Sequence, residues 1–314
     1  MNGGTKRVPQ WDPDALRGRL GPFPSPPPAV LDTFLAYYGF PDAQHEVGTL
    51  IDGDSQVVVH RFTPERPVAE CLFVTGYLDH VGLFGNLIQV LLDLGYRVTT
   101  FDLPGQGLSS GPRAQVESFG EYFSALERVV ATLGESELPC LALGQSTGGS
   151  AWLDWIRRHG DQGFDRFILM NPLIRPLNWR YLGWLHRALK PMLRTVKRGR
   201  GGGTHNERFN RFIQSEDSLQ SPVIPVAWLT AMVEFKNSIV AMPPASGERL
   251  WIFQGTEEET VDAPWNLARI AEKFPGARMV RVPGARHHLA NETEPYRQPV
   301  IDALASFIRT VDEP

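Results

Sequence analysis

The sequence has few cysteines, no long apolar run and no excess of positive charge. With only two cysteines in 314 residues, a disulfide-stabilised scaffold is excluded. Cys71 and Cys140 each lie in an apolar stretch. We therefore expect both to be reduced core residues, as the redox conditions of the cytosol allow.

No segment approaches the roughly 18 uninterrupted apolar residues of a membrane-spanning helix, and no run of secretory length follows the polar residues 1–10. These absences predict a cytoplasmic protein that is at most peripheral to a membrane. The 31 Lys and Arg residues are outnumbered by 35 Asp and Glu residues, giving a formal net charge of −4. A globally basic nucleic-acid-binding protein is thereby excluded, and we expect no nucleic-acid partner.

The composition is that of a globular protein with a sizeable core, because 42% of the residues are hydrophobic and 21% are charged. Residues 1–28 are rich in Gly and Pro and predict an extended leader, since proline fixes φ and removes a hydrogen-bond donor. The segment 29–38 is apolar enough for a short helix. Apolar residues on both sides of Asp52-Gly53 predict a β-hairpin over 47–62.

Short apolar strands and amphipathic helices alternate through the rest of the chain. The expected strands are 71–74, 97–101, 140–143, 167–170, 250–253 and 279–282. The expected helices are 84–94, 122–133, 147–158, 263–274 and 299–311. Continuous apolar strands between such helices predict an α/β fold with a mostly parallel sheet covered on both faces, to which the hairpin adds an antiparallel edge.

One segment, residues 173–244, interrupts this alternation. Its first half is basic, and a glycine tract lies at 199–203. Apolar residues recur at helical spacing over 179–192, with basic residues between them. We interpret 173–244 as a helical lid inserted into a core formed by 29–172 and 245–314. The basic face of the lid is a candidate for contact with an anionic membrane surface.

The most specific signal is the sequence GQSTGG at residues 144–149. It follows a predicted strand and precedes a predicted helix, which is the context of a G-x-S-x-G nucleophile elbow. Glycines flank Ser146 because larger side chains two residues away would clash in the strained turn. The start of the following helix would direct its N–H groups at an oxyanion formed there. The alternative is a βα turn without chemistry.

A serine nucleophile needs a base, and His287 follows the last predicted strand, with His288 as the neighbouring alternative. An acid should follow the penultimate strand, which gives the chain order Ser, acid, His. The residues that could serve are Glu257, Glu258, Glu259 and Asp262. For the oxyanion hole we expect the backbone amides of Thr147 and Tyr77, the latter in the loop after the strand 71–74.

In four segments the chain resembles α/β-hydrolases of the monoacylglycerol lipase and bacterial lysophospholipase group. They are VTGYLDH at 74–80, FDLPGQGLS at 101–109, the elbow, and GARHHLANE at 284–292. The resemblance implies the α/β-hydrolase fold, and it places the acid on Glu258, three residues after Gly255. The chain departs from the family at Thr75, Gln106 and Gln145, where histidine is common.

The expected function is hydrolysis of the carboxylic ester of a monoacyl lipid, either a lysophospholipid or a monoacylglycerol, through an acyl-enzyme. Acyl transfer, a short-chain carboxylesterase and a non-catalytic ligand-binding scaffold remain alternatives. No metal or cofactor is expected, since the sequence shows no ligand cluster. Trp228 and Met232 are candidates for lining an apolar substrate cleft, with core packing an equal alternative.

Overall fold

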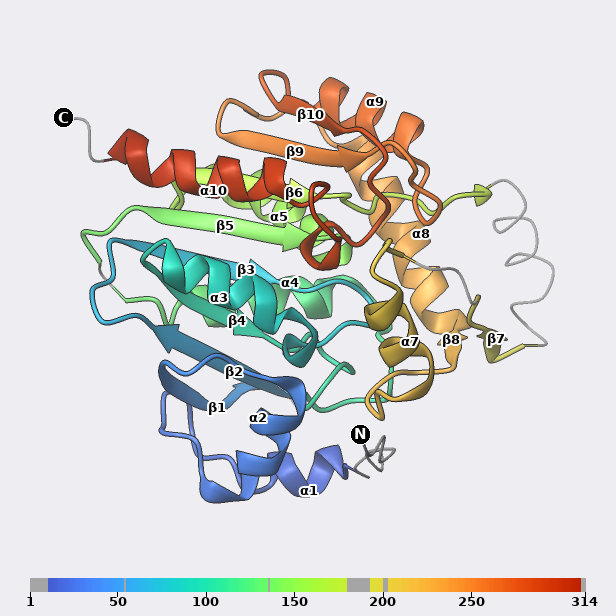
Figure 1. Ribbon diagram of the computed structural model, residues 1–314. Helices are drawn as coiled ribbons and strands as arrows, with labels where there is room; N and C mark the ends of the chain where they lie inside the picture. Colours follow the sequence, from blue (N-terminus) through green and yellow to red (C-terminus); the bar gives the residue numbers. More distant parts are fainter. Residues whose placement is uncertain (1–10, 54, 135, 180–192, 200–202, 312–314) are drawn as a thin grey trace.

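The centre of the computed structural model is an eight-stranded sheet with the order β1-β2-β4-β3-β5-β6-β9-β10 (Figure 1). The structure describes residues 11–311 except 54, 135, 180–192 and 200–202. The strands of the sheet are β1 (Gln44–Asp52), β2 (Ser55–Thr63), β3 (Ala69–Val74), β4 (Tyr96–Phe101), β5 (Cys140–Gln145), β6 (Arg166–Met170), β9 (Leu250–Gly255) and β10 (Arg278–Val282).

The sheet is parallel except at one edge. β1 and β2 form an antiparallel hairpin, and β2 pairs antiparallel with β4. All further neighbours in this sheet pair in parallel. Every residue of β3 is buried, which explains the apolar sequence of residues 71–74, while the buried Glu70 pairs with Arg97. The predicted mostly parallel sheet with an N-terminal antiparallel hairpin is therefore confirmed.

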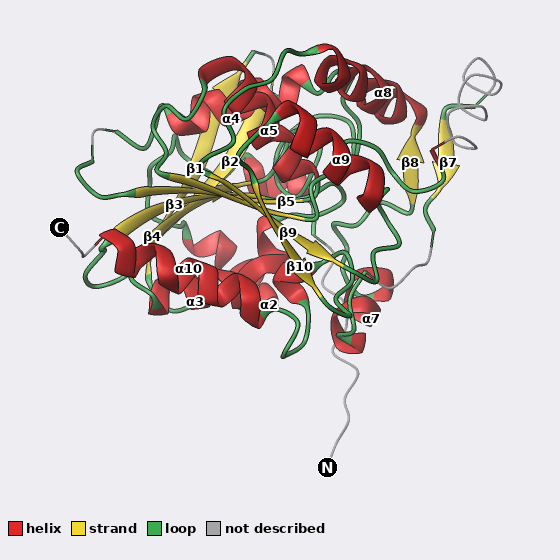
Figure 2. Cartoon of the chain, turned by 90° about the horizontal axis from the view of Figure 1, so that it is seen from above, coloured by secondary structure: helices red, strands yellow, loops and turns green. Residues whose placement is uncertain are grey.

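Helices cover both faces of this sheet (Figure 2). One face carries α4 (Gly120–Val130), α5 (Thr147–His159), α8 (Val226–Ala241) and α9 (Ala263–Lys273), whose apolar residues share one core cluster. The other face carries α3 (Gly85–Asp93) and α10 (Gln298–Val311), which share a second cluster. Both cysteines are free thiols: Cys71 is buried in the second cluster, and the half-buried Cys140 packs against the first.

The N-terminal segment corrects one prediction. Within the expected extended leader, α1 (Pro13–Arg17) is a helix. The Asp12 carboxylate accepts hydrogen bonds from the amides of Asp14 and Ala15, and proline is well tolerated at the first helical position. A 3₁₀ turn, η1 (Ala29–Leu31), then leads into α2 (Asp32–Tyr38), in agreement with the predicted short helix.

The segment 173–244 contains strands as well as helices. Besides α8 it forms α7 (Glu207–Ser215) and an antiparallel pair of short strands, β7 (Thr195–Lys197) and β8 (Val223–Pro225). A purely helical insertion was therefore an incomplete prediction. The helix expected over 179–192 lies outside the described residues apart from its first position. Because α8 packs into the main core, the boundaries of the lid stay a prediction.

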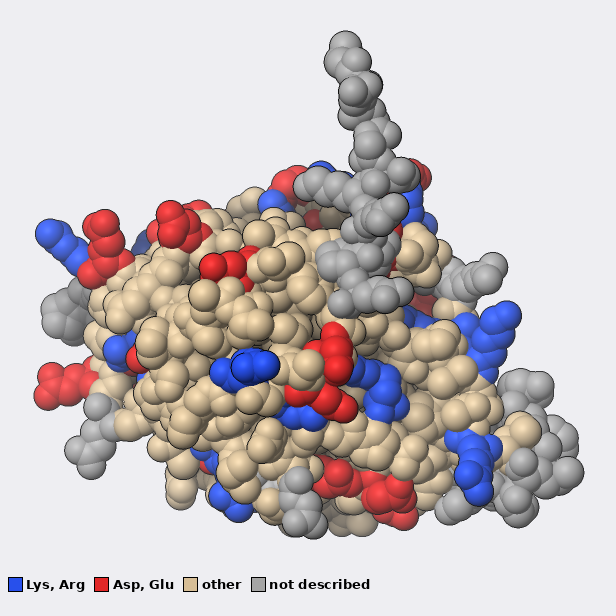
Figure 3. All heavy atoms as spheres, turned by 90° about the horizontal axis from the view of Figure 1, so that it is seen from below, with Lys and Arg blue, Asp and Glu red and all other residues tan. Residues whose placement is uncertain are grey.

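Side chains of both signs are interspersed on the face drawn in Figure 3, without a continuous basic track among the described residues. In the described part of the chain, no helix combines the length and apolar character needed to cross a membrane.

Candidate active site

Ser146 occupies a strained turn between β5 and α5, with φ 53° and ψ −110°. The flanking glycines are sterically required. A Cβ on Gly144 would lie 2.7 Å from the Trp152 ring, and one on Gly148 would lie 2.0 Å from the carbonyl oxygen of Val74. Such backbone conformations cost about 1–3 kcal/mol and persist where the surrounding structure enforces them, often at functional sites. The geometry matches the nucleophile elbow expected from the sequence.

His287 reaches Ser146 from the loop after β10. Its Nε2 lies 3.0 Å from the Ser146 Oγ, although the two residues are 141 positions apart. His288 points elsewhere: its Nε2 lies 3.2 Å from Asp79 Oδ1, and its ring stacks on Phe84. Of the two candidate bases, the structure therefore brings only His287 to the serine.

Glu258 contacts the other side of the His287 ring, with 2.7 Å between Oε2 and Nδ1. Its Oε1 accepts hydrogen bonds from the backbone amides of Thr260 and Val261, which fixes the carboxylate in place. If Nδ1–H donates to Glu258, Nε2 is left free to accept the serine proton. The three predicted residues thus form one continuous hydrogen-bonded chain.

The alternative acids are occupied or exposed. The side chain of Glu257 is 56% exposed, whereas that of Glu258 is 2% exposed. Glu259 is also exposed. Asp262 caps α9 through the Trp265 amide and pairs with Arg175 at 2.6 Å. The position that the family resemblance indicated is the one in contact with His287.

Glu258 and His287 shift each other's pKa in opposite directions. Burial alone would raise the pKa of Glu258, but His287 and the two backbone amides outweigh it and hold the pKa below its usual value. Burial alone would lower the pKa of His287, but the Glu258 carboxylate reverses this and raises it above its usual value. His287 is therefore a stronger base than a free imidazole.

The loop after β3 packs directly against the elbow. A Cβ on Gly76 would lie 3.3 Å from the Ser146 Cβ. The next residue, Tyr77, stacks its ring on Trp228 at 3.7 Å between centroids and donates its hydroxyl to the carbonyl of Ala114 at 2.8 Å. Its backbone is thereby held beside the serine. The role of the Tyr77 and Thr147 amides as oxyanion donors stays a prediction.

Asp102, directly after β4, holds the end of the loop that follows β3. Its carboxylate accepts hydrogen bonds from the amides of Val81 at 2.8 Å and Leu108 at 2.7 Å. Asp102 thus ties the 3₁₀ turn η2 (Val81–Phe84) to the loop after β4, which is a structural role.

Trp228 and Met232 are core residues in this structure, with 5% and 1% exposure. The indole of Trp228 donates to the Tyr122 hydroxyl at 3.2 Å. Packing, the alternative that the sequence left open, is what the structure shows for both. Direct contact with a substrate stays a prediction.

Asn171, directly after β6, has a role that the sequence did not reveal. Its side-chain amide donates to the carbonyls of His287 at 2.6 Å and Arg286 at 3.0 Å, and its Oδ1 accepts from the Gly255 amide at 2.8 Å. Asn171 therefore joins the histidine loop to the end of the strand that precedes Glu258. Its only signal in the sequence is a polar residue at the end of a buried strand.

Gln145 also holds the histidine loop, since its Nε2 donates to the same His287 carbonyl as Asn171, at 2.9 Å. Gln145 is a position where the resembling family commonly has histidine. The departure is compatible with the site, because glutamine provides the donor that fixes the histidine loop.

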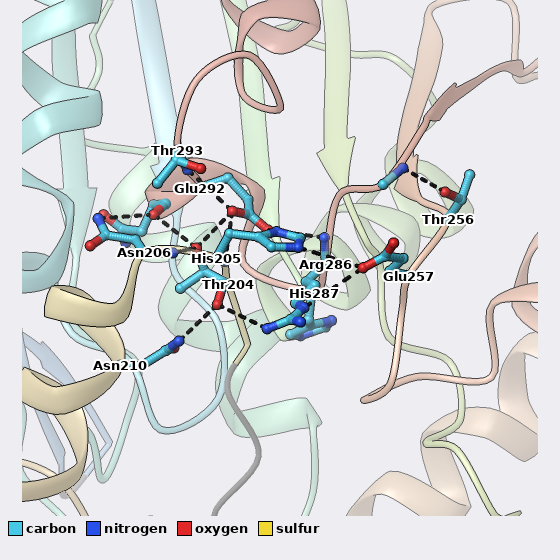
Figure 4. A network of polar contacts seen from close by, with 12 residues as sticks. Thr204, His205, Asn206, Asn210, Thr256, Glu257, Arg286, His287, Glu292 and Thr293 are labelled. Carbon is cyan, nitrogen blue, oxygen red and sulfur yellow. Dashed lines mark hydrogen bonds and ion pairs between the residues drawn. The ribbon is translucent and has the colours of Figure 1, made fainter.

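A second network ties the histidine loop to the segment 173–244 (Figure 4). The buried carboxylate of Glu292 accepts from the Arg286 amide at 3.0 Å and the Thr204 hydroxyl at 2.9 Å, and it lies 3.0 Å from His205 Nδ1. In addition, the His288 amide donates to the Gly203 carbonyl at 2.7 Å. The loop that carries His287 is thus held from two sides.

Within the described ranges, no three His, Cys, Asp or Glu side chains are grouped so that they could hold a metal ion. The absence of a cofactor stays a prediction.

Curated relatives agree with the predicted group. The chain is 30% identical to phospholipase YtpA of Bacillus subtilis over 110 residues, 35% of this chain and 42% of that protein, so the match spans less than half of that relative. It is 23% identical to a monoglyceride lipase homolog of monkeypox virus over 250 residues, 77% of this chain and 90% of that protein.

Solved structures show the same fold. A soluble variant of monoglyceride lipase from Saccharomyces cerevisiae has a TM-score of 0.71 at 17% identity, covering 84% of this chain and 94% of that one. The monoacylglycerol lipase of Paleococcus ferrophilus has a TM-score of 0.66 at 19% identity, covering 79% and 98%. The α/β-hydrolase fold and the resemblance to the monoacylglycerol lipase and bacterial lysophospholipase group are confirmed. The family model described as serine aminopeptidase, S33, matches residues 65–294, which is more than half of the chain. The chain therefore belongs to this family.

Proposed function

We propose that this protein is a serine hydrolase that cleaves the carboxylic ester of a monoacyl lipid, a lysophospholipid or a monoacylglycerol, through an acyl-enzyme. The observation that carries this proposal is the continuous chain from Ser146 Oγ through His287 to Glu258, with contacts of 3.0 and 2.7 Å. Such a chain generates a nucleophile from a hydroxyl that is otherwise weak at neutral pH.

In the proposed reaction, Ser146 Oγ attacks the ester carbonyl while His287 Nε2 takes the hydroxyl proton. The Tyr77 and Thr147 amides hold the oxyanion of the tetrahedral intermediate. As the ester C–O bond breaks, His287 returns the proton to the leaving glycerol oxygen. A water molecule then gives a proton to His287 and attacks the acyl-serine, and the fatty acid leaves as the serine regains its proton.

A lipid substrate is supported by the names of the relatives, a phospholipase and monoglyceride lipases. The half-buried Tyr77, whose ring packs on the core residue Trp228, adds an aromatic side chain beside the candidate nucleophile. A monoacyl lipid joins an apolar chain to a small polar group, which suits such surroundings.

The proposal is tested by comparing lysophospholipids, monoacylglycerols and short p-nitrophenyl esters as substrates of the wild-type protein. Higher kcat/KM for the monoacyl lipids supports it. A preference for short soluble esters would indicate that the protein is a carboxylesterase instead. Radiolabelled lysolipid also separates hydrolysis from acyl transfer, because transfer yields a diacyl product. If Ser146 failed to react with a fluorophosphonate probe, the result would indicate a non-catalytic ligand-binding scaffold.

We further propose that the protein is cytoplasmic and that the lid, residues 173–244, contacts anionic membrane surfaces. Lys197, Arg208 and Arg211 are exposed on this segment. Each basic residue near an anionic surface contributes about 1 kcal/mol, an attraction that salt weakens. Co-sedimentation with vesicles should therefore require anionic lipid and decline as the ionic strength rises. Equal binding to neutral vesicles would contradict the proposal.

A further inference from the structure

Arg198, directly after β7, is a half-buried cation in the segment 173–244. Its backbone amide donates to the carbonyl of Pro222, the residue before β8, at 3.1 Å. Its Nη1 donates to Gln220 Oε1. The Gln220 side chain in turn donates to Asp217 at 2.9 Å. The guanidinium is thus fixed through a neutral amide rather than by a carboxylate.

The carboxylates around Arg198 are already engaged by other groups. Asp79 lies 3.2 Å from His288, and Asp217 lies 2.9 Å from His80. Asp217 also accepts the Tyr38 hydroxyl at 2.7 Å. In the part of the chain that the structure describes, no Asp or Glu oxygen lies within ion-pair distance of Arg198. A cation that is withdrawn from water without a counter-ion is unfavourable, which indicates an anionic partner from outside the chain.

Hydrogen bonds connect Arg198, through Gln220 and Asp217, to His80 at the end of the loop that flanks Ser146. Burial lowers the pKa of Arg198, and the charge of Asp79 opposes this shift most strongly, followed by Tyr77. Asp79 also contributes to the raised pKa of His287. A Cβ on Gly76 would lie 2.5 Å from Asp79 Oδ2 and 3.3 Å from the Ser146 Cβ, so the carboxylate that interacts with Arg198 belongs to the loop beside the serine.

We propose that Arg198 binds the phosphate of a lysophospholipid head group and so selects phosphate-bearing monoacyl lipids over monoacylglycerols. This inference rests on the proposed function. In a lysophospholipid, the phosphate is attached to the same glycerol as the scissile ester, so both groups fit one site. The planar guanidinium offers paired N–H donors that match two phosphate oxygens, and such charge-assisted hydrogen bonds are stronger than neutral ones.

The sharpest test compares two substrates that differ only in the phosphate, 1-oleoyl lysophosphatidic acid and 1-oleoylglycerol. Arg198→Gln should lower kcat/KM for the phosphate-bearing lipid by roughly tenfold to hundredfold, mainly through KM, because a hydrogen bond to a charged group is lost. The rate with 1-oleoylglycerol should stay within about twofold. Arg198→Lys should recover part of the loss, because lysine keeps the positive charge but lacks the paired N–H donors of the guanidinium. Arg66→Gln, at an exposed position outside the lid, is the control for loss of one positive charge and should change neither rate.

A binding measurement removes the dependence on turnover. In calorimetry, sn-glycerol 3-phosphate should bind the wild-type protein and not Arg198→Gln, whereas glycerol should bind neither. Inorganic phosphate binding as tightly as glycerol phosphate would indicate a free-phosphate site and overturn the head-group assignment. An unchanged ratio of the two oleoyl substrates in Arg198→Gln would also overturn it. A wild-type protein that hydrolyses neither lipid but binds glycerol phosphate through Arg198 would refute the proposed function alone.

Discussion

Asn171 donates a hydrogen bond of 2.6 Å to the backbone carbonyl of His287, 116 residues further along the chain. Gln145, directly before the candidate nucleophile, donates to the same carbonyl at 2.9 Å. The candidate base is therefore positioned through its backbone from the end of β6 and from the elbow. Its side chain is oriented separately, by Glu258.

Asn171→Gly should lower kcat by roughly tenfold to hundredfold, because a shift of about 1 Å at the base weakens proton transfer. Glycine is the informative substitution, since Asn171 has a φ of 45° that glycine adopts without strain. Steady-state kinetics with a p-nitrophenyl ester should show kcat falling with little change in KM. Asn171→Asp, which keeps the acceptor but loses the donor, should not restore the rate. Wild-type kcat in both variants would exclude a positioning role.

Ser146→Ala and His287→Ala should each lower kcat by about 10⁴-fold or more while the fold survives. Ester hydrolysis measures the loss, and circular dichroism checks the fold. His288→Gln is the adjacent comparison, and we expect a change below about tenfold because His288 pairs with Asp79. A larger loss in His288→Gln than in His287→Ala would move the base to the neighbouring position.

Glu258→Gln should reduce kcat by about 10³- to 10⁴-fold, since the amide cannot stabilise the imidazolium. Glu257→Gln is the matched control on the same loop, and its exposed side chain should make the change negligible. A large loss in the control with none in Glu258→Gln would reassign the acid.

The pH dependence follows from the raised pKa of His287. The base must be neutral to accept the serine proton, so kcat/KM should rise as pH increases through this pKa, which lies above 6.5. Because the Glu258 carboxylate causes the rise, Glu258→Gln should shift the acidic limb of the profile to lower pH. A shift in the opposite direction would contradict this electrostatic assignment.

Ser146→Gly should stabilise the fold while removing activity. The strained backbone at Ser146 costs about 1–3 kcal/mol, and glycine relieves this strain. Glycine also loses about 1 kcal/mol more chain entropy on folding, which offsets part of the gain. Urea unfolding should show a free energy of unfolding higher by about 1 kcal/mol. Ser306→Gly, in the helix α10, is the comparison and should be destabilised by a similar amount. Destabilisation at both positions would show that the elbow stores no strain.

Local sequence was sufficient for most of the secondary structure. The central strands β5, β6 and β9 were predictable because strands buried on both faces are rich in apolar residues along their whole length. The helix α1 was missed because a single Asp12 cap outweighs a Pro- and Gly-rich composition. The strands β7 and β8 were missed because three-residue strands carry almost no periodic signal.

The sequence by itself determined the candidate nucleophile. Glycines on both sides of Ser146 are a local steric requirement, and the surrounding strand and helix are readable from neighbouring residues. It also restricted the base to two adjacent histidines and the acid to one short loop.

Only the tertiary structure decided among those neighbours. Whether His287 or His288 faces Ser146, and which carboxylate faces the imidazole, depends on the path of loops that Asn171, Gln145 and Glu292 hold across the sheet. The same holds for the burial of Trp228 and for the charge of Arg198, which has no carboxylate within ion-pair distance among the described residues. These features arise from contacts between residues far apart in the chain, and no local pattern encodes them.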